Sequence, residues 1–221
     1  MRINTIDNLR GIAFILMVIQ HIFYFYDVSM NYTTSYSSID FIALSGLISR
    51  TLFILLAGYM IGYKETSIEK RAYRSGEILL HGLSITLLTY FLYPNYFIKF
   101  GILHFLAVGT LLISFVAPYK IVTILVLILF LFIKIPSIHP YIDLMTGTGL
   151  PSNSMDYFPL KTWLPVLLIG LIIGQNLDLN KLGVLDFNNT ITDIGKNSLN
   201  LYTTHVIILL VFYKLLNKNK I

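Results

Sequence analysis

Long apolar runs separated by short polar stretches constrain this chain more than any other feature of its sequence. A helix needs about 20 apolar residues to cross the hydrocarbon core of a membrane, with a usable range of roughly 17–25. Seven segments meet or approach that length: 7–27, 41–63, 76–93, 101–117, 120–135, 161–177 and 197–216.

The composition agrees with these runs. Of the 221 residues, 56% are apolar and 12% are charged, whereas soluble domains are about 45–50% apolar and about 25% charged. We therefore predict an all-α, polytopic membrane helix bundle with about seven transmembrane helices, forming a single domain over residues 1–221. Such a protein is multi-pass in the cell membrane and has the lipid bilayer as its first partner.

The basic residues near the span ends predict the orientation. Arg2 and Arg10 lie at the N-terminus, four basic residues lie in loop 64–75, Lys181 follows the sixth span, and loop 28–40 has no basic residue. This places the N-terminus in the cytoplasm and, with seven spans, the C-terminus outside. The basic C-terminal sequence KLLNKNKI departs from that rule.

Placing an ionisable side chain inside a span costs roughly 2.5–3.5 kcal/mol of insertion free energy. Each such residue therefore needs a structural or functional explanation. In the first span, Asp7, Arg10, Phe14, Met17 and His21 follow one another at spacings of three and four, so they share one helix face. The face is about 21 Å long, with charges at its inner end and an imidazole at its outer end. An ion pair at a helix start explains the two charges equally well, whereas the deep imidazole favours a function.

The second and third spans carry further charged and polar residues. Arg50, near the middle of the second span, must meet a carboxylate, backbone carbonyls or a ligand anion, so a structural salt bridge and a ligand contact both fit it. Arg74 precedes a stripe of Glu77, His81 and Ser84 at helical spacing. We expect this stripe to face inward near the inner mouth, although an internal hydrogen-bond network would have the same pattern.

Three histidines lie on separate spans. His104 opens the fourth span, and the last span carries Ser198, Tyr202 and His205 at helical spacing. We expect His21, His104 and His205 to converge. Their spacing is not that of zinc ligands and the chain has no cysteine, so no metal site is predicted.

The loop before the sixth span supplies the last candidates. Asp156 could overhang an outer site, while Trp163 is typical of an aromatic ring at the membrane interface. The imidazoles, carboxylates and hydroxyls available in this chain suit proton transfer or acyl transfer.

Four stretches together resemble a known family. They are IDNLRGIAFILMVIQH (6–21), YFIKFGILHFLAVGTLL (96–112), DYFPLKTWLPVLLIG (156–170) and GKNSLNLYTTH (195–205). In this order they resemble the catalytic domain of heparan-alpha-glucosaminide N-acetyltransferase in its small prokaryotic form, which is related to membrane-bound acyltransferases with an N-terminal D-x-L-R-G helix. The family motifs fall on Asp7, Arg10, Gly11, His21, Gly101, His104, Asp156, Ser198, Tyr202 and His205.

The resemblance implies transfer of an acyl group, typically acetyl, from cytoplasmic acyl-coenzyme A to an acceptor such as a sugar or glycan at the outer face, with no metal. The implied catalytic residues are His21, His104, Asp156 and His205, with either His21 or His104 as the base. The implied substrate contacts are Ser198, Tyr202 and Trp163. The donor would be bound by Asp7, Arg10, Arg50, Arg71, Arg74, Glu77 and His81, although the positive-inside rule also explains the basic residues of loop 64–75.

The chain also departs from this family. The lysosomal animal enzyme is far longer, with extra spans and a luminal domain, and its catalytic histidine lies beyond the end of the first catalytic-domain helix. Loop 28–40 has no histidine, so His21 is assigned as the equivalent base by position alone. The resemblance does not carry over the acceptor.

Two other functions fit the same residues. A small proton-coupled transporter could use the histidines as a relay, and a non-catalytic membrane scaffold could keep its polar residues as contacts between helices. Seven spans make a thin wall around a passage through the membrane, which leaves a homodimer open. No nucleic-acid partner is expected, because the net charge of +5 belongs to a membrane protein.

Overall fold

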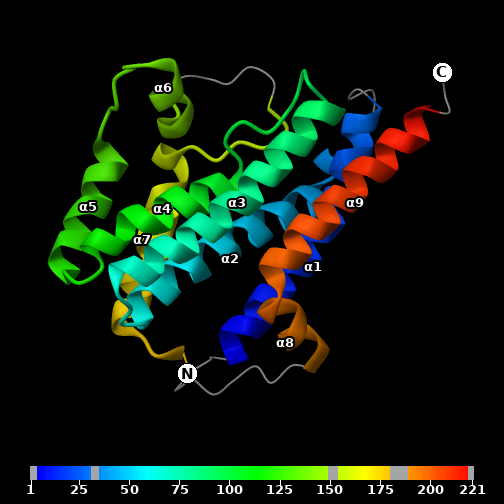
Figure 1. Cartoon of the computed structure of the whole chain (residues 1–221). Helices are drawn as coiled ribbons and strands as arrows, with labels where there is room; N and C mark the ends of the chain where they lie inside the picture. The colour runs from blue at the N-terminus through cyan, green and yellow to red at the C-terminus, as the bar shows by residue number, and fades with distance from the viewer. Residues whose placement is uncertain (1–3, 31–34, 149–153, 180–188, 219–221) are drawn as a thin grey trace. The chain divides into compact units, whose positions relative to one another are not determined.

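The computed structural model describes residues 4–30, 35–148, 154–179 and 189–218 (Figure 1). Within these residues the chain is helical and has no strand, which confirms the all-α prediction. Arg2 and Lys181, which entered the prediction of orientation, lie outside the described residues, as does the end of the basic C-terminal sequence. The helices are α1 (Asn4–Ser29), α2 (Asp40–Tyr63), α3 (Ile68–Leu92), α4 (Ile102–Val116), α5 (Lys120–Phe132), α6 (Pro140–Thr146), α7 (Leu160–Asn176), α8 (Asn189–Lys196) and α9 (Ser198–Lys218), with a 3-10 turn η1 (Tyr36–Ser38) after α1.

Four of the described helices, α1, α2, α3 and α9, are long and apolar enough to cross a membrane. The other three predicted spans form the shorter apolar helices α4, α5 and α7. The structure therefore supports a helical membrane bundle, and four of the seven predicted segments reach spanning length.

The structure differs from the sequence prediction at the third span. This helix begins at Ile68 instead of residue 76, because the hydroxyl of Ser67 accepts a hydrogen bond from the backbone N–H of Lys70 and caps the helix start. Most of the predicted loop 64–75 is therefore helical, and Arg71 and Arg74 lie on the first turns of α3. Two predicted loops also contain short helices, α6 and α8.

The chain divides into two compact units, of which unit 1 comprises Met1–Phe53 and Leu179–Ile221 and unit 2 comprises Ile54–Asp178. The boundary falls inside α2. The prediction of a single domain over residues 1–221 stays a prediction, and the two units are described separately.

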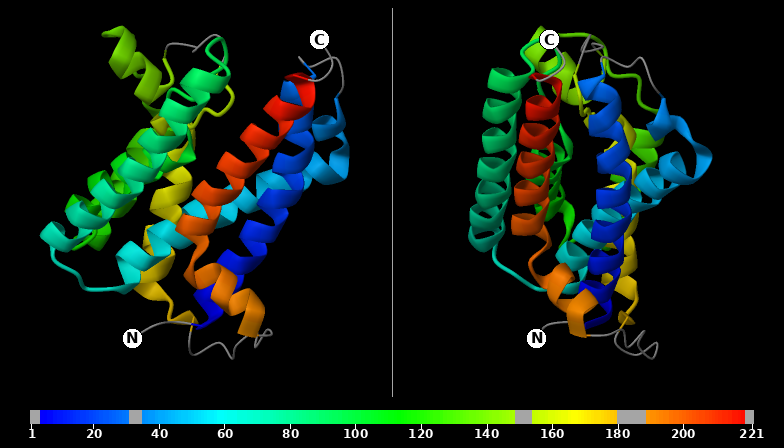
Figure 2. Two further views of the ribbon diagram at one scale, coloured as in Figure 1. Left: turned by 45° about the vertical axis from the view of Figure 1, so that its right-hand side comes forward. Right: turned by 90° about the vertical axis from the view of Figure 1, so that its right-hand side faces the viewer.

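In unit 1, α1 and α9 lie side by side and run in the same direction (Figure 2). Phe14 contacts His205 with ring centroids 5.3 Å apart, and further along both helices Tyr26 contacts Tyr213 at 5.9 Å. Because the residue numbers rise together along the two helices, α1 and α9 are parallel.

The short helix α8 packs against the first turns of α1 with almost no space between the backbones. A Cβ on Gly195 would lie 1.7 Å from the carbonyl oxygen of Asp7, and a Cβ on Gly11 would lie 2.2 Å from the carbonyl oxygen of Ile191. Both distances are far below a van der Waals contact, so each of these positions requires glycine.

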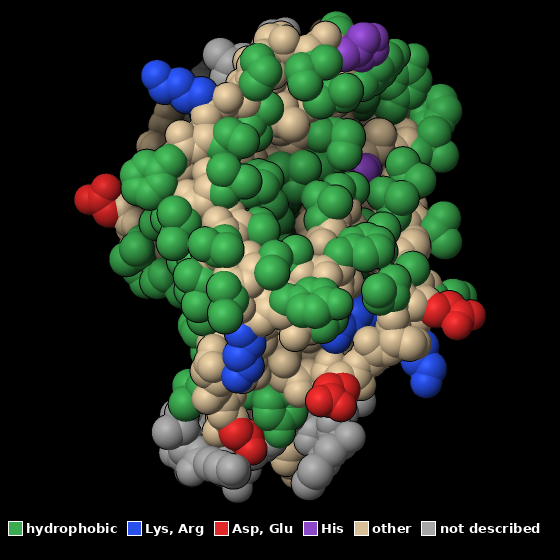
Figure 3. Space-filling model, turned by 90° about the vertical axis from the view of Figure 1, so that its left-hand side faces the viewer, with side chains coloured by type: hydrophobic (Ala, Val, Ile, Leu, Met, Phe, Trp, Pro, Cys, Tyr) green, Lys and Arg blue, Asp and Glu red, His purple; other side chains and the backbone are tan. Residues whose placement is uncertain are grey.

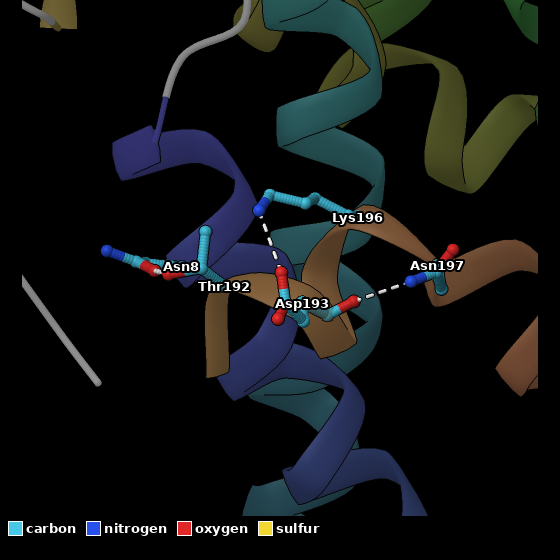
Figure 4. Close-up of polar contacts among 5 residues, drawn as sticks. All are labelled: Asn8, Thr192, Asp193, Lys196 and Asn197. Carbon is cyan, nitrogen blue, oxygen red and sulfur yellow. Dashed lines mark hydrogen bonds and ion pairs between the residues drawn. The ribbon is translucent and has the colours of Figure 1, made fainter. Parts of the chain in front are cut away.

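Polar contacts complete this packing (Figure 4). The hydroxyl of Thr192 donates to the side-chain oxygen of Asn8, which joins α8 to α1. Within the α8 region, Lys196 lies 2.7 Å from the carboxylate of Asp193, and the amide of Asn197 donates to the Asp193 carbonyl at 3.0 Å. Residues 189–196, which the sequence placed in a connection before the last span, thus form a helix that packs on α1.

In unit 2, α3 packs along α4 and α5 packs along α7. The part of α2 that belongs to this unit meets α7 through glycines four residues apart on both helices. A Cβ on Gly58 would lie 2.1 Å from the carbonyl oxygen of Leu167, and a Cβ on Gly174 would lie 2.2 Å from the carbonyl oxygen of Tyr59. Small residues at this spacing let membrane helices approach backbone to backbone.

The outward side of α5 is apolar. Thr123 is the buried residue of this helix, while Ile121 is 75% exposed and Phe132 is 81% exposed. On the side of unit 2 that carries α5, hydrophobic side chains cover most of the visible surface, and the charged side chains lie at its rim and lower part (Figure 3). A surface of this kind suits contact with lipid.

We predict that Gly58→Ala lowers the free energy of unfolding by about 1–3 kcal/mol, because the new methyl group would force α2 and α7 apart. Gly76→Ala in α3 is the matched control, since a Cβ there would meet nothing within 4 Å. Thermal unfolding of the purified proteins in detergent measures the difference. Equal unfolding temperatures for the two variants would contradict the close approach of α2 and α7.

Candidate functional site

A hydrogen-bonded pair of histidines joins α1 to α9 within unit 1. Nδ1 of His21 lies 2.9 Å from Nε2 of His205. The two rings are inclined by only 11° and their centroids are 5.1 Å apart. Because the nitrogens are much closer than the centroids, the rings meet edge to edge in nearly one plane, which is the geometry of an N–H···N bond. The structure thus brings together two of the three histidines that we expected to converge.

Aromatic rings enclose this pair. Tyr202 meets the ring of His205 edge-on at 5.5 Å and the ring of His21 edge-on at 6.1 Å. Phe14 meets His205 edge-on at 5.3 Å from α1. The residues come from the polar stripes that the sequence showed on the first and last spans, so these two stripes face each other.

The second nitrogen of His205 is also engaged. Its Nδ1 lies 3.0 Å from the backbone carbonyl oxygen of Leu201, one turn earlier in α9. A carbonyl oxygen only accepts hydrogen bonds, so Nδ1 of His205 is the donor in this contact. Sequence analysis missed Leu201, because an apolar residue gives no sign that its carbonyl has a second partner.

Arg50 packs near α1 and has no ion-pair partner within the described part of the chain. Its Nε donates to the carbonyl of Gly46 at 2.9 Å, so of the three partners considered, backbone carbonyl is the one observed. A Cβ on Gly46 would lie 3.2 Å from Nη2 of Arg50 and 2.6 Å from Cγ of Gln20. Arg50 is therefore packed near Gln20 of α1, the residue that precedes His21.

Asp156 lies in unit 2, where it organises the start of α4. Its Oδ2 accepts a hydrogen bond from the backbone N–H of Ile102 at 3.0 Å. A Cβ on Gly101 would lie 2.6 Å from the same oxygen, so glycine is needed for the carboxylate to reach the helix end. A carboxylate at this position is stabilised by the helix dipole, and the contact fixes the 154–159 segment to α4.

His104 also holds the start of α4. Its Nδ1 accepts from the backbone N–H of Gly101 at 3.3 Å, so a neutral ring carries its hydrogen on Nε2, which lies 3.3 Å from the hydroxyl of Thr86. That hydroxyl donates onward to the carbonyl of Ile98 at 2.8 Å. Both ring nitrogens therefore hold structural contacts within unit 2, and convergence of His104 with the pair in unit 1 stays a prediction.

Two of the predicted charged sites form ion pairs one turn apart. In α1, Nη1 of Arg10 lies 3.4 Å from Oδ1 of the buried Asp7. In α3, Nη1 of Arg74 lies 2.6 Å from Oε2 of Glu77, and both side chains are about half exposed. The simpler of our two interpretations of the first pair, an ion pair at a helix start, matches this geometry.

Arg71 holds the end of α2. Its Nη2 donates to the carbonyl oxygens of Ile61 at 3.0 Å and Lys64 at 2.9 Å. A cation at a helix C-terminus satisfies carbonyls that have no partner within the helix. The positive charge near loop 64–75 therefore has a structural use in addition to any contact with a donor.

The remaining predicted residues are spread over both units. Ser198 begins α9, one turn before Tyr202. Trp163 lies in the first turn of α7 with its ring 5.0 Å from that of Phe158. His81 lies in α3, but the buried side of this helix consists of other residues, namely Ser75, Gly82, Ile85 and Thr89.

Sequence analysis also missed Thr86, which contacts His104, and Gln20, which packs against Gly46 near Arg50. A threonine in an apolar run and a glutamine beside a histidine were the available signals, and neither identifies its partner. Among the described residues, no group of three or more metal-ligating side chains forms.

Comparison with known proteins gives one finding. The family described as heparan-alpha-glucosaminide N-acetyltransferase, catalytic, matches residues 2–207. No curated protein and no solved structure matches the chain. The family match covers both histidine-containing clusters.

We predict that Thr86→Val destabilises the protein by about 1–3 kcal/mol, because it leaves Nε2 of His104 and the carbonyl of Ile98 without their shared hydroxyl. Thr204→Val, at an exposed position of α9, is the matched control and should be nearly neutral. Thermal unfolding in detergent measures both. If Thr86→Val unfolds like the control, the hydroxyl does not hold the α3–α4 junction.

Proposed function

We propose that this chain, which belongs to the heparan-alpha-glucosaminide N-acetyltransferase catalytic family, is a membrane acyltransferase that transfers an acetyl group from acyl-coenzyme A. The match over residues 2–207 supports the reaction class. The single structural observation that carries the site is the hydrogen bond between His21 and His205. We place the acceptor, a sugar or another small molecule with a free hydroxyl or amine, at the outer face.

In the proposed reaction, His21 is the general base. The oxygen or nitrogen of the acceptor attacks the thioester carbonyl carbon, and its proton passes to Nε2 of His21. The tetrahedral adduct then collapses and the C–S bond breaks. Coenzyme A leaves as a thiolate and recovers the proton from His21.

Arg50 supplies the positive charge in this proposal. A guanidinium with no carboxylate partner among the described residues retains donors for a ligand anion. We assign to it an anionic group of the donor or the oxygen that becomes negative during attack. Tyr202 contacts both histidine rings, and with Ser198 it is our candidate for binding the acceptor.

The coenzyme A phosphates require cations at the cytoplasmic side. Our candidate cations are Arg10 near the start of α1 and Arg71 and Arg74 near the start of α3, with His81 further along α3. Asp7 and Glu77 would orient Arg10 and Arg74 through their ion pairs. A guanidinium binds phosphate through parallel hydrogen bonds. Arg71 is the most specific of the three arginines, because Arg10 and Arg74 each form an ion pair with a carboxylate. In the observed structure it donates to carbonyls at the end of α2, and phosphate would share or replace those contacts.

The parallel direction of α1 and α9 supports an odd number of spans. If both helices cross the bilayer in the same direction, the number of spans from α1 to α9, both included, is odd. The four helices of spanning length alone give an even number, so an odd number of the shorter helices α4, α5 and α7 must also cross. Seven spans, with the N-terminus in the cytoplasm and the C-terminus outside, meet this requirement.

We predict that His21→Ala lowers the rate of acetyl transfer by about 10²–10⁴-fold, the usual contribution of a general base. The assay uses purified protein in lipid nanodiscs with acetyl-coenzyme A and a panel of amino sugars and other sugars. Release of coenzyme A can be followed with a thiol reagent, because the chain has no cysteine that would add a background.

The matched control is His139→Ala, which removes a histidine at the start of α6 and should leave the rate unchanged. Transfer that persists in His21→Ala would show that another group is the base. Substrate uptake into proteoliposomes without any acyl donor would support the proton-coupled transporter instead. Failure to bind any coenzyme A derivative, with tolerance of alanine at His21, His104 and His205, would support the scaffold.

For topology, we predict that Ser38→Cys and Lys220→Cys are labelled by a membrane-impermeant maleimide in intact cells. Glu65→Cys should be labelled only after the membrane is permeabilised, because α2 returns the chain to the cytoplasm. Labelling is read by a mass shift on a gel, and the cysteine-free parent chain is the blank. If Lys220→Cys behaves like Glu65→Cys, the C-terminus is cytoplasmic and the odd count is wrong.

A further inference from the structure

We propose that His205 is a positioning residue that fixes the tautomer of His21, so that Nε2 of His21 keeps its lone pair and Nδ1 carries the hydrogen. This inference rests on the proposed function for its chemical use, but its geometry stands on described contacts alone. It assigns a role to each nitrogen of both rings.

The backbone carbonyl of Leu201 decides which atoms donate and which accept in the hydrogen bonds that link it to His205 and His21. The carbonyl oxygen of Leu201 lies 3.0 Å from Nδ1 of His205 and cannot donate. Nδ1 of His205 must therefore carry a hydrogen. In a neutral imidazole the other nitrogen is then an acceptor, so Nε2 of His205 presents a lone pair toward α1.

Both rings are neutral in this arrangement. A charge inside a membrane span is costly without a counter-ion, and no carboxylate forms an ion pair with either histidine within the described part of the chain. The nearby charge is that of Arg50, which packs near Gln20, the residue before His21, and has the same sign as an imidazolium. Arg50 thus disfavours a second positive charge at this position.

The tautomer of His21 follows from these two steps. Nε2 of His205 accepts, and Nδ1 of His21 lies 2.9 Å from it with the rings nearly coplanar. Nδ1 of His21 is therefore the donor, and the lone pair of this ring is on Nε2. The hydrogen bond at one ring nitrogen decides whether the other carries a hydrogen. Without an acceptor for Nδ1 of His21, the hydrogen could move to Nε2.

The surrounding rings keep this geometry in place. Tyr202 packs edge-on against both imidazoles, and Phe14 packs edge-on against His205. Rotation of either ring would break the coplanar bond and these contacts together. The base is therefore oriented before any substrate binds.

A general base is often oriented by a neighbouring group that hydrogen-bonds to its other nitrogen. His205 has this place beside His21. When Nε2 of His21 accepts the acceptor's proton, the new imidazolium still donates from Nδ1 to His205, so the positive charge is stabilised as it forms. The carbonyl of Leu201 polarises His205 for this role. A neutral acceptor does this less strongly than a carboxylate would, and it adds no charge to the membrane interior.

The experiment compares His205→Gln with His205→Leu in the full chain. The amide oxygen of glutamine can take the place of Nε2 and accept from His21, whereas leucine cannot accept. Nitrogen NMR of protein labelled with ¹⁵N-histidine reports which ring nitrogen of His21 carries the hydrogen, and a His21→Gln sample assigns the signals. Thermal unfolding of each variant checks that it is folded.

We expect the wild type and His205→Gln to show the hydrogen on Nδ1 of His21, and His205→Leu to lose that preference. The kcat for acetyl transfer should fall on the order of 10²-fold in His205→Leu and recover to within about tenfold in His205→Gln, with KM for acetyl-coenzyme A unchanged. A role in packing alone would not predict recovery with glutamine.

A wild-type spectrum with the hydrogen on Nε2 of His21 would overturn the inference, as would an unchanged spectrum in His205→Leu. If the spectra follow the expectation but the wild type acylates no acceptor, the positioning role holds and the proposed function fails. The two failures are therefore distinguishable.

Discussion

A polar group inside the hydrocarbon region has to find its partner within the protein, because the lipid offers none. This requirement accounts for how the polar residues of the spans are arranged. The two histidines of unit 1 bond to each other, Arg50 bonds to a carbonyl of its own helix, and the hydroxyl of Ser49 reaches the carbonyl of Ala13 on α1. Each contact links or braces helices as it satisfies a polar atom, so the candidate site and the packing of α1 depend on the same bonds.

Close backbone contact is the second organising feature, and glycine makes it possible at two separate places. In unit 1, Gly11 and Gly195 let α8 rest on the first turns of α1, and in unit 2, Gly58 and Gly174 let α2 and α7 touch. Without much hydrophobic driving force between helices in a membrane, such packing supplies association energy. In unit 1 this close approach fixes the first turns of α1 against α8.

The sequence predicted the helical class and the polar stripes of the first and last helices, because hydropathy and a period near 3.6 residues report directly on burial. It did not predict α8, since an eight-residue amphipathic helix is too short to stand out from a polar connection. Nor could it distinguish His104 from His21. The partners of His104 include a backbone N–H and the hydroxyl of Thr86, and such contacts depend on the fold and leave no pattern in the residue order.

The close packing of α8 on α1 has a consequence for the D-x-L-R-G signature. Asp7 and Gly11 lie where α8 is seated, at the opposite end of α1 from the imidazole of His21. The signature thus describes how a helix is docked, and the proposed base, His21, lies outside it. A descendant of this chain could lose the proposed base and still retain the signature residues, so the signature alone does not report on the proposed chemistry.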